Sequence, residues 1–391
     1  MTFDTIQDAV EDLCAGKPII VVDDEDRENE GDLVMLAEHA TQSSINFMVK
    51  YGRGLICTPI HHTIAERLNL RKMTRENTDP HGTAFTVSID HMSTTTGISA
   101  KERANTIKAL LNDESTAHEF NRPGHIFPLI AHPKGIHARG GHTEAAIELA
   151  NLCDSKPVGV ICEIMNDDGT MARLDDLLQY KKIHQLKLIN IEQLKKHISS
   201  IEHTATVNMP TQYGNFTMYG FIEKATEKEH LALLKDKPRN DMPVRIHSEC
   251  ITGDVFTSKR CDCGEQLDQA LKIAEQQNGM IIYLRQEGRG IGLTNKLRAY
   301  ELIEQGYDTV EANHQLGFTD DLRTYHVAAD ILKFFDINRV KLMSNNPRKI
   351  NGLSSYDIDV TRQAHEIHFN EINEQYLKTK KEKLGHMLEV K

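Results

Sequence analysis

The sequence predicts an α+β protein made of two mixed α/β domains in tandem. The chain has 391 residues, which is enough for two or three domains of ordinary size. Short apolar runs typical of strands alternate with segments of helical spacing in both halves of the chain. A polar stretch near residues 198–206 separates the two halves. We therefore expect one domain over residues 1–200 and a second over residues 201–391.

The elements expected in the first half follow from the spacing of its apolar residues. Apolar positions from 6 to 13 share one helical face, and PIIVVDD predicts a buried strand that ends in acidic residues. Phe85, Val87 and Ile89 alternate with polar residues, as on a half-buried strand. Further elements are expected in this order: a helix at 142–153, the strand GVICEI, a helix at 170–186 and the polar helix NIEQLKKH.

The second half continues the same alternation. A helix is expected at 267–274, directly after a pair of cysteines, and the buried strand GMIIYL follows it. The segment YHVAADILKFF predicts a helix, and RVKLM predicts the strand after it. The tail from 370 to 391 is expected to be a solvated helix.

Bulk composition narrows the class of protein. The 39% hydrophobic and 26% charged residues are typical of a soluble globular chain. No apolar run approaches the roughly 18 residues that a membrane span needs. The first residues are amphipathic and acidic, whereas targeting peptides are basic, so we expect a cytoplasmic protein. Seven cysteines without the spacing of a disulfide framework fit a reducing compartment.

The charge balance argues against a nucleic-acid-binding protein. The net charge is −11, divided into −8 for residues 1–200 (21 basic against 29 acidic) and −3 for residues 201–391 (25 against 28). Neither half has the basic excess that gripping a phosphate backbone requires. Anionic small molecules would have to be held by local clusters of Arg, His and metal.

Three cysteines lie close together in the segment ECITGDVFTSKRCDCGEQ, at Cys250, Cys261 and Cys263. Zinc stabilises thiolates at neutral pH, and catalytic zinc sites often combine three protein ligands with one water. Three buried thiols, or a structural zinc site with a distant fourth ligand, remain alternatives. A C-x-C pair is less diagnostic of zinc than two C-x-x-C pairs.

Polar loops suited to an anionic substrate surround these cysteines in the sequence. RIHSE comes directly before Cys250, and QEGRGIGL is a glycine-rich loop after a strand, where backbone can approach phosphate. The GRGIG run does not match the G-x-G-x-x-G fingerprint, so a dinucleotide-binding fold is rejected. Asp321 and Arg323 precede a helix, and SNNPRK follows another strand.

In this order, RIHSECITGDVF, KRCDCGEQL, RQEGRGIGL, EANHQLGF, DDLR and SNNPRK resemble GTP cyclohydrolase II, from about residue 205 to about residue 353. The resemblance implies that water at an open zinc position attacks C8 of GTP, that the ring opens, and that formate and diphosphate leave. It implies zinc ligation by Cys250, Cys261 and Cys263. It also implies a larger set of GTP contacts: Arg245, Ile246, His247, Ser248, Glu249, Gln266, Glu287, Gly288, Arg289, Thr309, Ser344 and Lys349.

The same resemblance assigns Asp321 as proton acceptor and Arg323 as nucleophile at the α-phosphate. A guanidinium has a pKa above about 12, so stabilising charge on the phosphoryl group is an equally good role for Arg323. Tyr300 is a further candidate near the base. The sequence departs from the family at Ser344, more often Thr, and at RQAHEI (362–367), where the usual ending is R-x-P-L.

The first half carries an acidic loop, VVDDEDRENEGDL, with seven carboxylates between residues 23 and 32. A solvated loop is the ordinary interpretation of such a run, and the spacing does not fit an EF-hand. The loop directly follows an apolar strand, however, and crowding like charges there is costly unless a cation offsets them. A second polar cluster, at 122–146, contains four histidines, and His142 and Thr143 begin a helix there.

These segments, together with TVSIDH, STTTGISA, RPGHIFPL, RGGHTEAA and GVICEIMNDDGTMAR, resemble 3,4-dihydroxy-2-butanone 4-phosphate synthase over about residues 3–198. The resemblance implies conversion of D-ribulose 5-phosphate to the four-carbon phosphate and formate. It implies that Glu28 and His142 bind Mg²⁺ or Mn²⁺ and that His125 and Glu163 are essential. Sugar-phosphate contacts are implied for Arg27, Glu28, Asp32, Arg139, Thr143 and Glu163.

Together the two resemblances predict a bifunctional enzyme that supplies both precursors of riboflavin and has only small-molecule partners. The family also implies a homodimer. A rival hypothesis is a regulatory second half that binds zinc and nucleotide without turnover, but Asp321 and Arg323 argue against it. A zinc-knuckle nucleic-acid binder is a weaker rival, because the basic patch and interleaved aromatics are absent.

Overall fold

The computed structural model describes residues 3–319, 321–365, 381, 385 and 387. The chain forms two compact units, residues 1–198 and 199–391, and each is considered by itself. Helices in the described part of the chain are all too short or too polar to cross a membrane. The expected helix at 370–391 lies almost wholly outside the described residues.

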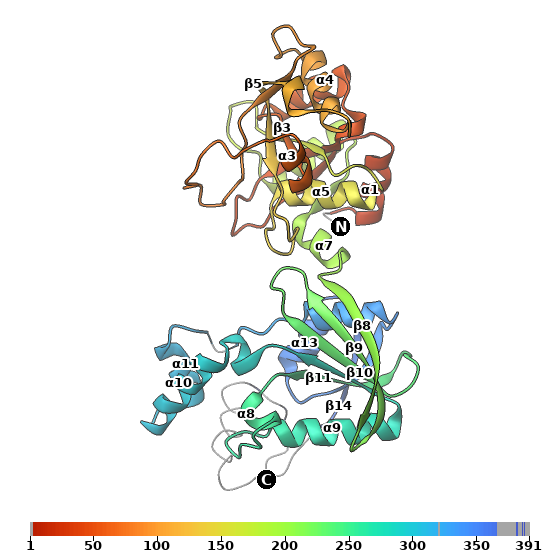
Figure 1. The fold of residues 1–391 in the computed structure, drawn as a ribbon, viewed down its shortest axis with the longest axis vertical. Helices are drawn as coiled ribbons and strands as arrows, with labels where there is room; N and C mark the ends of the chain where they lie inside the picture. Colours follow the sequence, from red (N-terminus) through yellow and green to blue (C-terminus); the bar gives the residue numbers. More distant parts are fainter. Residues whose placement is uncertain (1–2, 320, 366–380, 382–384, 386, 388–391) are drawn as a thin grey trace. The chain divides into compact units, whose positions relative to one another are not determined.

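The first unit is built on a seven-stranded mixed sheet (Figure 1). Its strands pair both parallel and antiparallel, and the central ones are buried on both faces. In spatial order they are β4 (Ile89–His91), β5 (Phe120–Ile130), β3 (Cys57–Ile60), β6 (Gly159–Glu163), β2 (Gly31–Leu36), β1 (Ile19–Val22) and β7 (Leu188–Asn190).

Helices cover both faces of this sheet, because neighbouring strand residues point to opposite sides. Ile20 and Leu33 belong to the core under one helical layer, whereas Ile19 and Val34 belong to the core under the other. The first layer contains α2 (Gln42–Phe47), α3 (His62–Arg67), α4 (Ala100–Leu110) and α6 (Leu174–His184). The second contains α1 (Ile6–Cys14), α5 (His142–Leu152) and α7 (Ile191–His197).

The second unit also has a seven-stranded sheet, with a parallel part and an antiparallel part. The parallel strands are β14 (Asp359–Gln363), β13 (Arg339–Met343), β11 (Met242–Ser248) and β12 (Met280–Leu284). The antiparallel strands that continue the sheet are β10 (Glu229–Leu234), β9 (Gly214–Glu223) and β8 (Ile201–Thr211).

In this unit α9 (Cys263–Gln277) lies along one face of the sheet (Figure 1). Ala270 and Ala274 of this helix belong to the core on that face. The opposite face is covered by α12 (His326–Phe334) and α13 (Pro347–Ser354). Three further helices, α8 (Ile251–Asp254), α10 (Leu293–Glu304) and α11 (Thr309–Gln315), follow the carboxyl ends of β11 and β12.

The α+β class and the tandem arrangement of two mixed domains are confirmed. The helices and strands expected from apolar spacing are present, with ends shifted by a few residues. The strand expected at 85–89 is shorter than predicted. Only Ile89–His91 forms a ladder there, and Phe85 makes an isolated bridge with Leu129.

The cysteine spacing was expected to fit a reducing compartment, but one pair of cysteines is joined. A disulfide joins Cys14, at the end of α1, to Cys153, just after α5, with Cα atoms 5.6 Å apart. The two positions are separated by 139 residues in the sequence. Their approach depends on both helices covering the same face of the sheet, which cysteine spacing alone does not show.

Candidate active sites

The second unit has a pocket of about 440 Å³ at the carboxyl ends of β11, β12 and β13. Ligands commonly bind at this edge of a parallel sheet, because the loops that follow each strand converge there. Most residues implied by the resemblance line the pocket: Arg245, His247, Ser248, Glu249, Cys250, Cys261, Cys263, Gln266, Glu287, Gly288, Arg289, Thr309, Arg323, Ser344 and Lys349.

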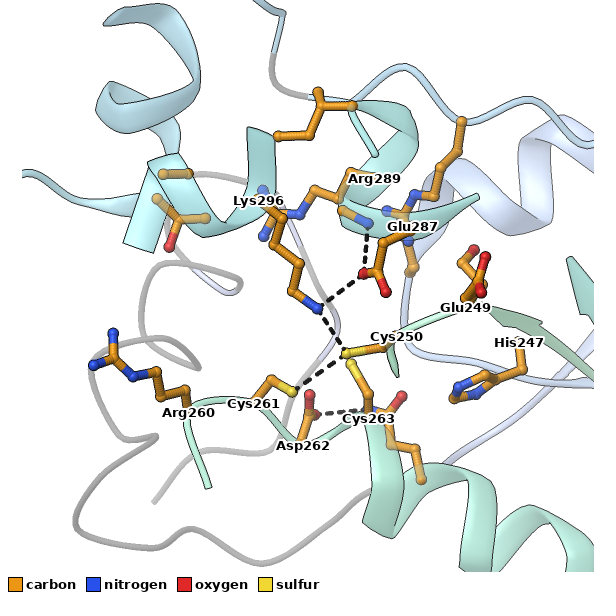
Figure 2. Close-up of a pocket in the computed structure, with 18 of the residues that line it drawn as sticks. His247, Glu249, Cys250, Arg260, Cys261, Asp262, Cys263, Glu287, Arg289 and Lys296 are labelled. Atoms are coloured by element: carbon orange, nitrogen blue, oxygen red, sulfur yellow. Dashed lines mark hydrogen bonds and ion pairs between the residues drawn. The ribbon is translucent and has the colours of Figure 1, made fainter. Parts of the chain in front are cut away.

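Three sulfur atoms meet in this pocket (Figure 2). The Cys250 and Cys261 Sγ atoms are 3.6 Å apart, and those of Cys250, Cys261 and Cys263 all lie within 4.8 Å of one another. Gly253 makes this convergence possible, because a Cβ there would lie 3.0–3.2 Å from Cys250 Sγ, Cys261 Sγ and Cys263 Cβ. A compact set of three thiols beside an open pocket fits zinc with a free coordination position.

Protons are unevenly shared among the three thiols. Hydrogen bonds from Cys261, Cys263 and Lys296 hold the pKa of Cys250 far below its usual range, although burial of this thiol raises its pKa. The hydrogen bond with Cys250 raises the pKa of Cys261 to about 11 and also raises that of Cys263. The two neighbouring thiols and Lys296 thus all favour the thiolate form of Cys250.

A buried ion pair between Lys296 and Glu287 lies next to Cys250. Lys296 Nζ donates to Glu287 Oε1 at 2.9 Å, and Glu287 Oε2 accepts from the Ile251 N–H at 2.6 Å. Burial alone lowers the pKa of Lys296, but its hydrogen bonds to Glu287 and Cys250 outweigh that effect and raise it. The loop after β12 is thus fixed to the segment that follows Cys250.

The loop that contains Arg289 has unusual backbone geometry. Gly288 and Arg289 have φ values of +61° and +60°, a left-handed conformation that is unfavourable for Arg. The Arg289 carbonyl accepts from the Leu322 N–H at 3.0 Å, which ties this loop to the Asp321–Arg323 segment. Arg289 Nη1 is buried and has no hydrogen-bond partner among the described residues. A buried cationic donor of this kind suits a phosphate oxygen.

Two buried basic side chains that line the pocket are anchored to the sheet. Arg245 donates to the Met343 carbonyl at 2.8 Å and to the Gln266 side chain, and Lys349 donates to the Ile246 carbonyl at 2.7 Å. Ile246 itself points into the core and does not line the pocket. Its place in the ladder allows its carbonyl, rather than its side chain, to position a pocket residue.

Asp321 and Arg323 form a bidentate ion pair. Arg323 Nε and Nη2 donate to the two Asp321 oxygens at 2.8 and 2.6 Å. Burial raises the pKa of Asp321, but Arg323 more than offsets this, and the net pKa is lowered. Arg323 lines the pocket, whereas Asp321 lines a neighbouring hollow with Arg348. The Asp321 carboxylate therefore holds the Arg323 guanidinium from the side of that hollow, outside the pocket.

His365 lies in the stretch where the sequence departs from the family. It is buried in the pocket wall, and its Nε2 donates to the Gln266 carbonyl at 2.9 Å. Burial, and then the charge of Arg245, lower the pKa of His365 to about 4, so its ring is neutral.

In the first unit, the acidic loop is shaped by a carboxylate that the sequence did not single out. Asp23 is buried and accepts from the backbone N–H groups of Glu28 and Glu30 at 3.3 and 2.9 Å. It also accepts from Arg27 Nη1 at 2.7 Å. Asp23 thereby folds the loop back on the end of β1 and sets the position of Glu28.

Glu28 and Asp32 both approach one nitrogen of His142. His142 Nδ1 lies 3.9 Å from Glu28 Oε2 and 3.9 Å from Asp32 Oδ1. His142 Nε2 lies 3.0 Å from the Val21 carbonyl, which only accepts hydrogen bonds, so Nε2 carries the proton. Burial lowers the pKa of His142, and its neutral Nδ1 faces the carboxylates. Asp23, Glu28 and His142 thus offer an oxygen-rich donor set that fits a divalent cation.

Glu163 belongs to the same end of the sheet. It is paired with Asp32 across β2 and β6, and Glu163 Oε2 accepts from the Leu55 N–H at 2.8 Å. A Cβ at Gly54 would lie 2.5 Å from that oxygen, so only glycine allows this close approach. Burial, and then the charge of Glu163, raise the pKa of Asp32 well above its usual range.

The remaining predicted residues of the first unit have partners of their own. His125 Nδ1 lies 2.7 Å from Asp90 Oδ2, and the described residues show no direct contact between His125 and the Glu28–His142 cluster. Arg139 donates to Glu144 at 2.6 Å and to Thr83 Oγ1 at 3.0 Å. Thr143 is buried in the first turn of α5, next to His142.

Sequence reasoning missed three side chains that position these groups: Asp23, Asp90 and Lys296. Asp23 and Asp90 lie inside the quoted segments VVDDEDRENEGDL and TVSIDH, so a strand-end carboxylate was available as a signal. Lys296 gave no comparable signal, because an isolated lysine on a helix is usually exposed.

Comparisons with known proteins agree with this division into two sites. The family model for 3,4-dihydroxy-2-butanone 4-phosphate synthase matches residues 7–197, and that for GTP cyclohydrolase II matches residues 202–365. A riboflavin biosynthesis protein RibBA from Staphylococcus epidermidis is 55% identical over 99% of this chain and 100% of its own length.

A RibBA from Staphylococcus aureus is 56% identical over the same shares of the two chains. A solved structure, described as RibBX, a two-domain 3,4-dihydroxy-2-butanone 4-phosphate synthase from A. baumannii, has a TM-score of 0.63 and 32% identity. It covers 92% of this chain and 100% of its own. The chain therefore belongs to the bifunctional riboflavin biosynthesis enzymes, in which a 3,4-dihydroxy-2-butanone 4-phosphate synthase is joined to a GTP cyclohydrolase II.

Proposed function

We propose that residues 1–200 convert D-ribulose 5-phosphate to L-3,4-dihydroxy-2-butanone 4-phosphate and formate. Residues 201–391 hydrolyse GTP to 2,5-diamino-6-(5-phosphoribosylamino)pyrimidin-4-one, formate and diphosphate. The observation that carries this assignment is the pair of ligand clusters, one in each unit: Asp23, Glu28 and His142, and the three cysteines.

In the second unit, Cys250, Cys261 and Cys263 hold zinc, which when bound acts as a Lewis acid and makes water a better nucleophile near neutral pH. Arg245, Arg289 and Lys349 bring positive charge to the pocket and bind the triphosphate. Arg323, held by Asp321, stabilises charge on the phosphoryl group. The further GTP contacts are those that line the pocket: His247, Ser248, Glu249, Gln266, Glu287, Gly288, Thr309 and Ser344.

In the first unit, Glu28 and His142 hold Mg²⁺ or Mn²⁺, which when bound polarises the sugar carbonyl and eases removal of a neighbouring proton. Asp32 and Glu163 exchange protons with the sugar carbons, because their pairing across the sheet favours one proton between two carboxylates. Arg27, Arg139 and Thr143 bind the sugar phosphate, and His125 acts with the carboxylates. A homodimer is also proposed, on the family resemblance alone, and a cytoplasmic location on the acidic, amphipathic first residues.

Two substitutions test the separation of the sites. Cys263→Ser removes one zinc ligand and is expected to abolish formate release from GTP while ribulose 5-phosphate turnover stays at the wild-type rate. Glu28→Ala is expected to do the reverse. Each variant's retained activity is its own control for folding. If either substitution removes both activities from a folded chain, the two sites are not separate.

A further inference from the structure

Lys296 occupies an unexpected place next to the three-sulfur cluster (Figure 2). It belongs to α10, and it is only 9% exposed although lysine is rarely buried. Its Nζ lies 3.0 Å from Cys250 Sγ, 2.8 Å from Thr252 Oγ1 and 2.9 Å from Glu287 Oε1. The side chain thus links α10, the segment after β11 and the loop after β12.

The three contacts use the full hydrogen-bonding capacity of the side chain. A lysine ammonium has three N–H donors, and here each has an acceptor within 3.0 Å. No donor is left for GTP, although Lys296 lines the pocket. Lys296 is therefore suited to act on Cys250 rather than on the substrate.

The charges around Lys296 show why a cation is needed at this position. Three thiolates around one divalent zinc carry a net charge of −1, and the buried Glu287 carboxylate adds another. Buried charge without a partner is costly, whereas one ammonium between Cys250 and Glu287 offsets part of both. Groups that hydrogen-bond to metal ligands in this way also fix the orientation of those ligands.

We propose that Lys296 is a positioning residue of the zinc centre, which holds the Cys250 thiolate by an N–H···S hydrogen bond and fixes it to the Glu287 loop. The inference rests on the proposed zinc site in the second unit. It assigns Lys296 no contact with the reacting atoms. Its loss is expected to weaken zinc retention before it affects anything else.

The test compares Lys296→Met with wild type in the full-length chain. Met keeps the length and the apolar stem of the side chain and removes the charge and the donors. Zinc affinity, measured by competition with a chromophoric chelator, is expected to fall about 10- to 100-fold. In the cobalt-substituted protein, the thiolate-to-cobalt charge-transfer band is expected to shift to lower energy, because Cys250 loses a hydrogen bond and becomes a stronger donor.

Matched controls separate this role from a general loss of structure. Lys272→Met makes the same replacement at an exposed position of α9, where Lys272 donates to the surface residue Asp268 at 2.6 Å, and is expected to leave zinc affinity and the cobalt band unchanged. Ribulose 5-phosphate turnover by the first unit reports that the rest of the chain is folded.

The outcomes distinguish a wrong role for Lys296 from a wrong zinc site. If wild type shows no thiolate-to-cobalt band, the zinc site itself is wrong. If wild type binds cobalt and Lys296→Met matches it in affinity and band position, the role of Lys296 is wrong. If Lys296→Met loses the folded second unit, Lys296→Arg decides, because it keeps charge and donors. Near-wild-type zinc affinity in that folded variant supports the inference, and a loss of 10-fold or more contradicts it.

Discussion

Asp32 on β2 and Glu163 on β6 lie directly opposite each other in an antiparallel ladder, so two acidic side chains are cross-strand neighbours. Like charges in this arrangement destabilise a sheet. Burial, and then Glu163, raise the pKa of Asp32, which shows that its charged form is unfavourable in the folded protein. Such a pair is expected where function, rather than stability, sets the residue type.

Asp32→Asn is therefore expected to stabilise the first unit while it removes activity. Neutral Asn avoids the buried charge, so the free energy of unfolding of the chelator-treated protein should rise by about 1 kcal/mol. Turnover of ribulose 5-phosphate should fall by about 10²-fold or more, because a proton-transfer group is lost. Urea denaturation and formate release measure the two effects. A destabilised variant, or one that keeps its activity, would contradict this account of the pair.

Asp90 is expected to act on the first reaction through His125. Asp90→Asn removes the carboxylate 2.7 Å from His125 Nδ1 and should lower kcat for ribulose 5-phosphate by about 10²-fold with little change in KM. The double variant Asp90→Asn, His125→Asn should be no worse than His125→Asn alone. Asp113→Asn, at an exposed ion pair, is the matched control. Additive losses in the double variant would show that Asp90 acts independently of His125.

Arg323 is expected to stabilise charge without forming a covalent bond to phosphate. Its guanidinium is held by both oxygens of Asp321, which favours the protonated form. Arg323→Lys keeps a charge but loses the bidentate geometry, so kcat for GTP should fall by about 10²- to 10³-fold. Wild type supplied with GTP labelled at the α-phosphate, and quenched in denaturant at alkaline pH where an arginine N–P bond would survive, should yield unlabelled protein. Label retained on the wild-type chain would instead favour the nucleophile role.

Glu223 is expected to make the stability of the second unit depend on pH. Burial raises its pKa, but the His230 side chain 3.7 Å away and hydrogen bonds from His326 and Thr226 outweigh this and hold the pKa well below the ordinary value of 4.5. A lowered pKa stabilises the folded state above pH 4.5, and this stabilisation is lost as the pH falls below that value.

At pH 7, Glu223→Gln should therefore lower the free energy of unfolding by about 2–3 kcal/mol. The difference from wild type should shrink by about 1 kcal/mol at pH 4. Denaturation of both proteins across this range is the measurement, with the exposed Glu202→Gln as control. A difference that stays constant with pH would exclude Glu223 as the titrating group.

Sequence reasoning found those site residues that lie close to one another in the chain. Cys250, Cys261 and Cys263 are within fourteen residues of one another, and a helix begins at Cys263, so a short segment already specifies their approach. The same holds for Glu28 and Asp32 after the buried run of β1. The alternating fold was predictable for the same reason, because apolar spacing is local information.

The parts that it missed depend on contacts between distant segments. Lys296 is 46 residues from Cys250, and only the packing of α10 beside the cysteine segment brings Nζ to the sulfur. The pairing of Asp32 with Glu163 depends on the register of β2 with β6, and a slip of one residue would turn Glu163 to the other face. Ile246 is the opposite case. Its segment RIHSE was correctly placed at the pocket, but side chains alternate along a strand and that of Ile246 points into the core.

The central claim is that one chain carries two independent formate-releasing sites. Formate release by the purified wild-type protein, with GTP and ribulose 5-phosphate supplied in separate reactions, tests it most directly. The account predicts formate from each substrate alone, at rates unchanged by adding the other. Formate from ribulose 5-phosphate only, in protein shown to contain zinc, would contradict it and would make the second unit a nucleotide-binding domain without turnover.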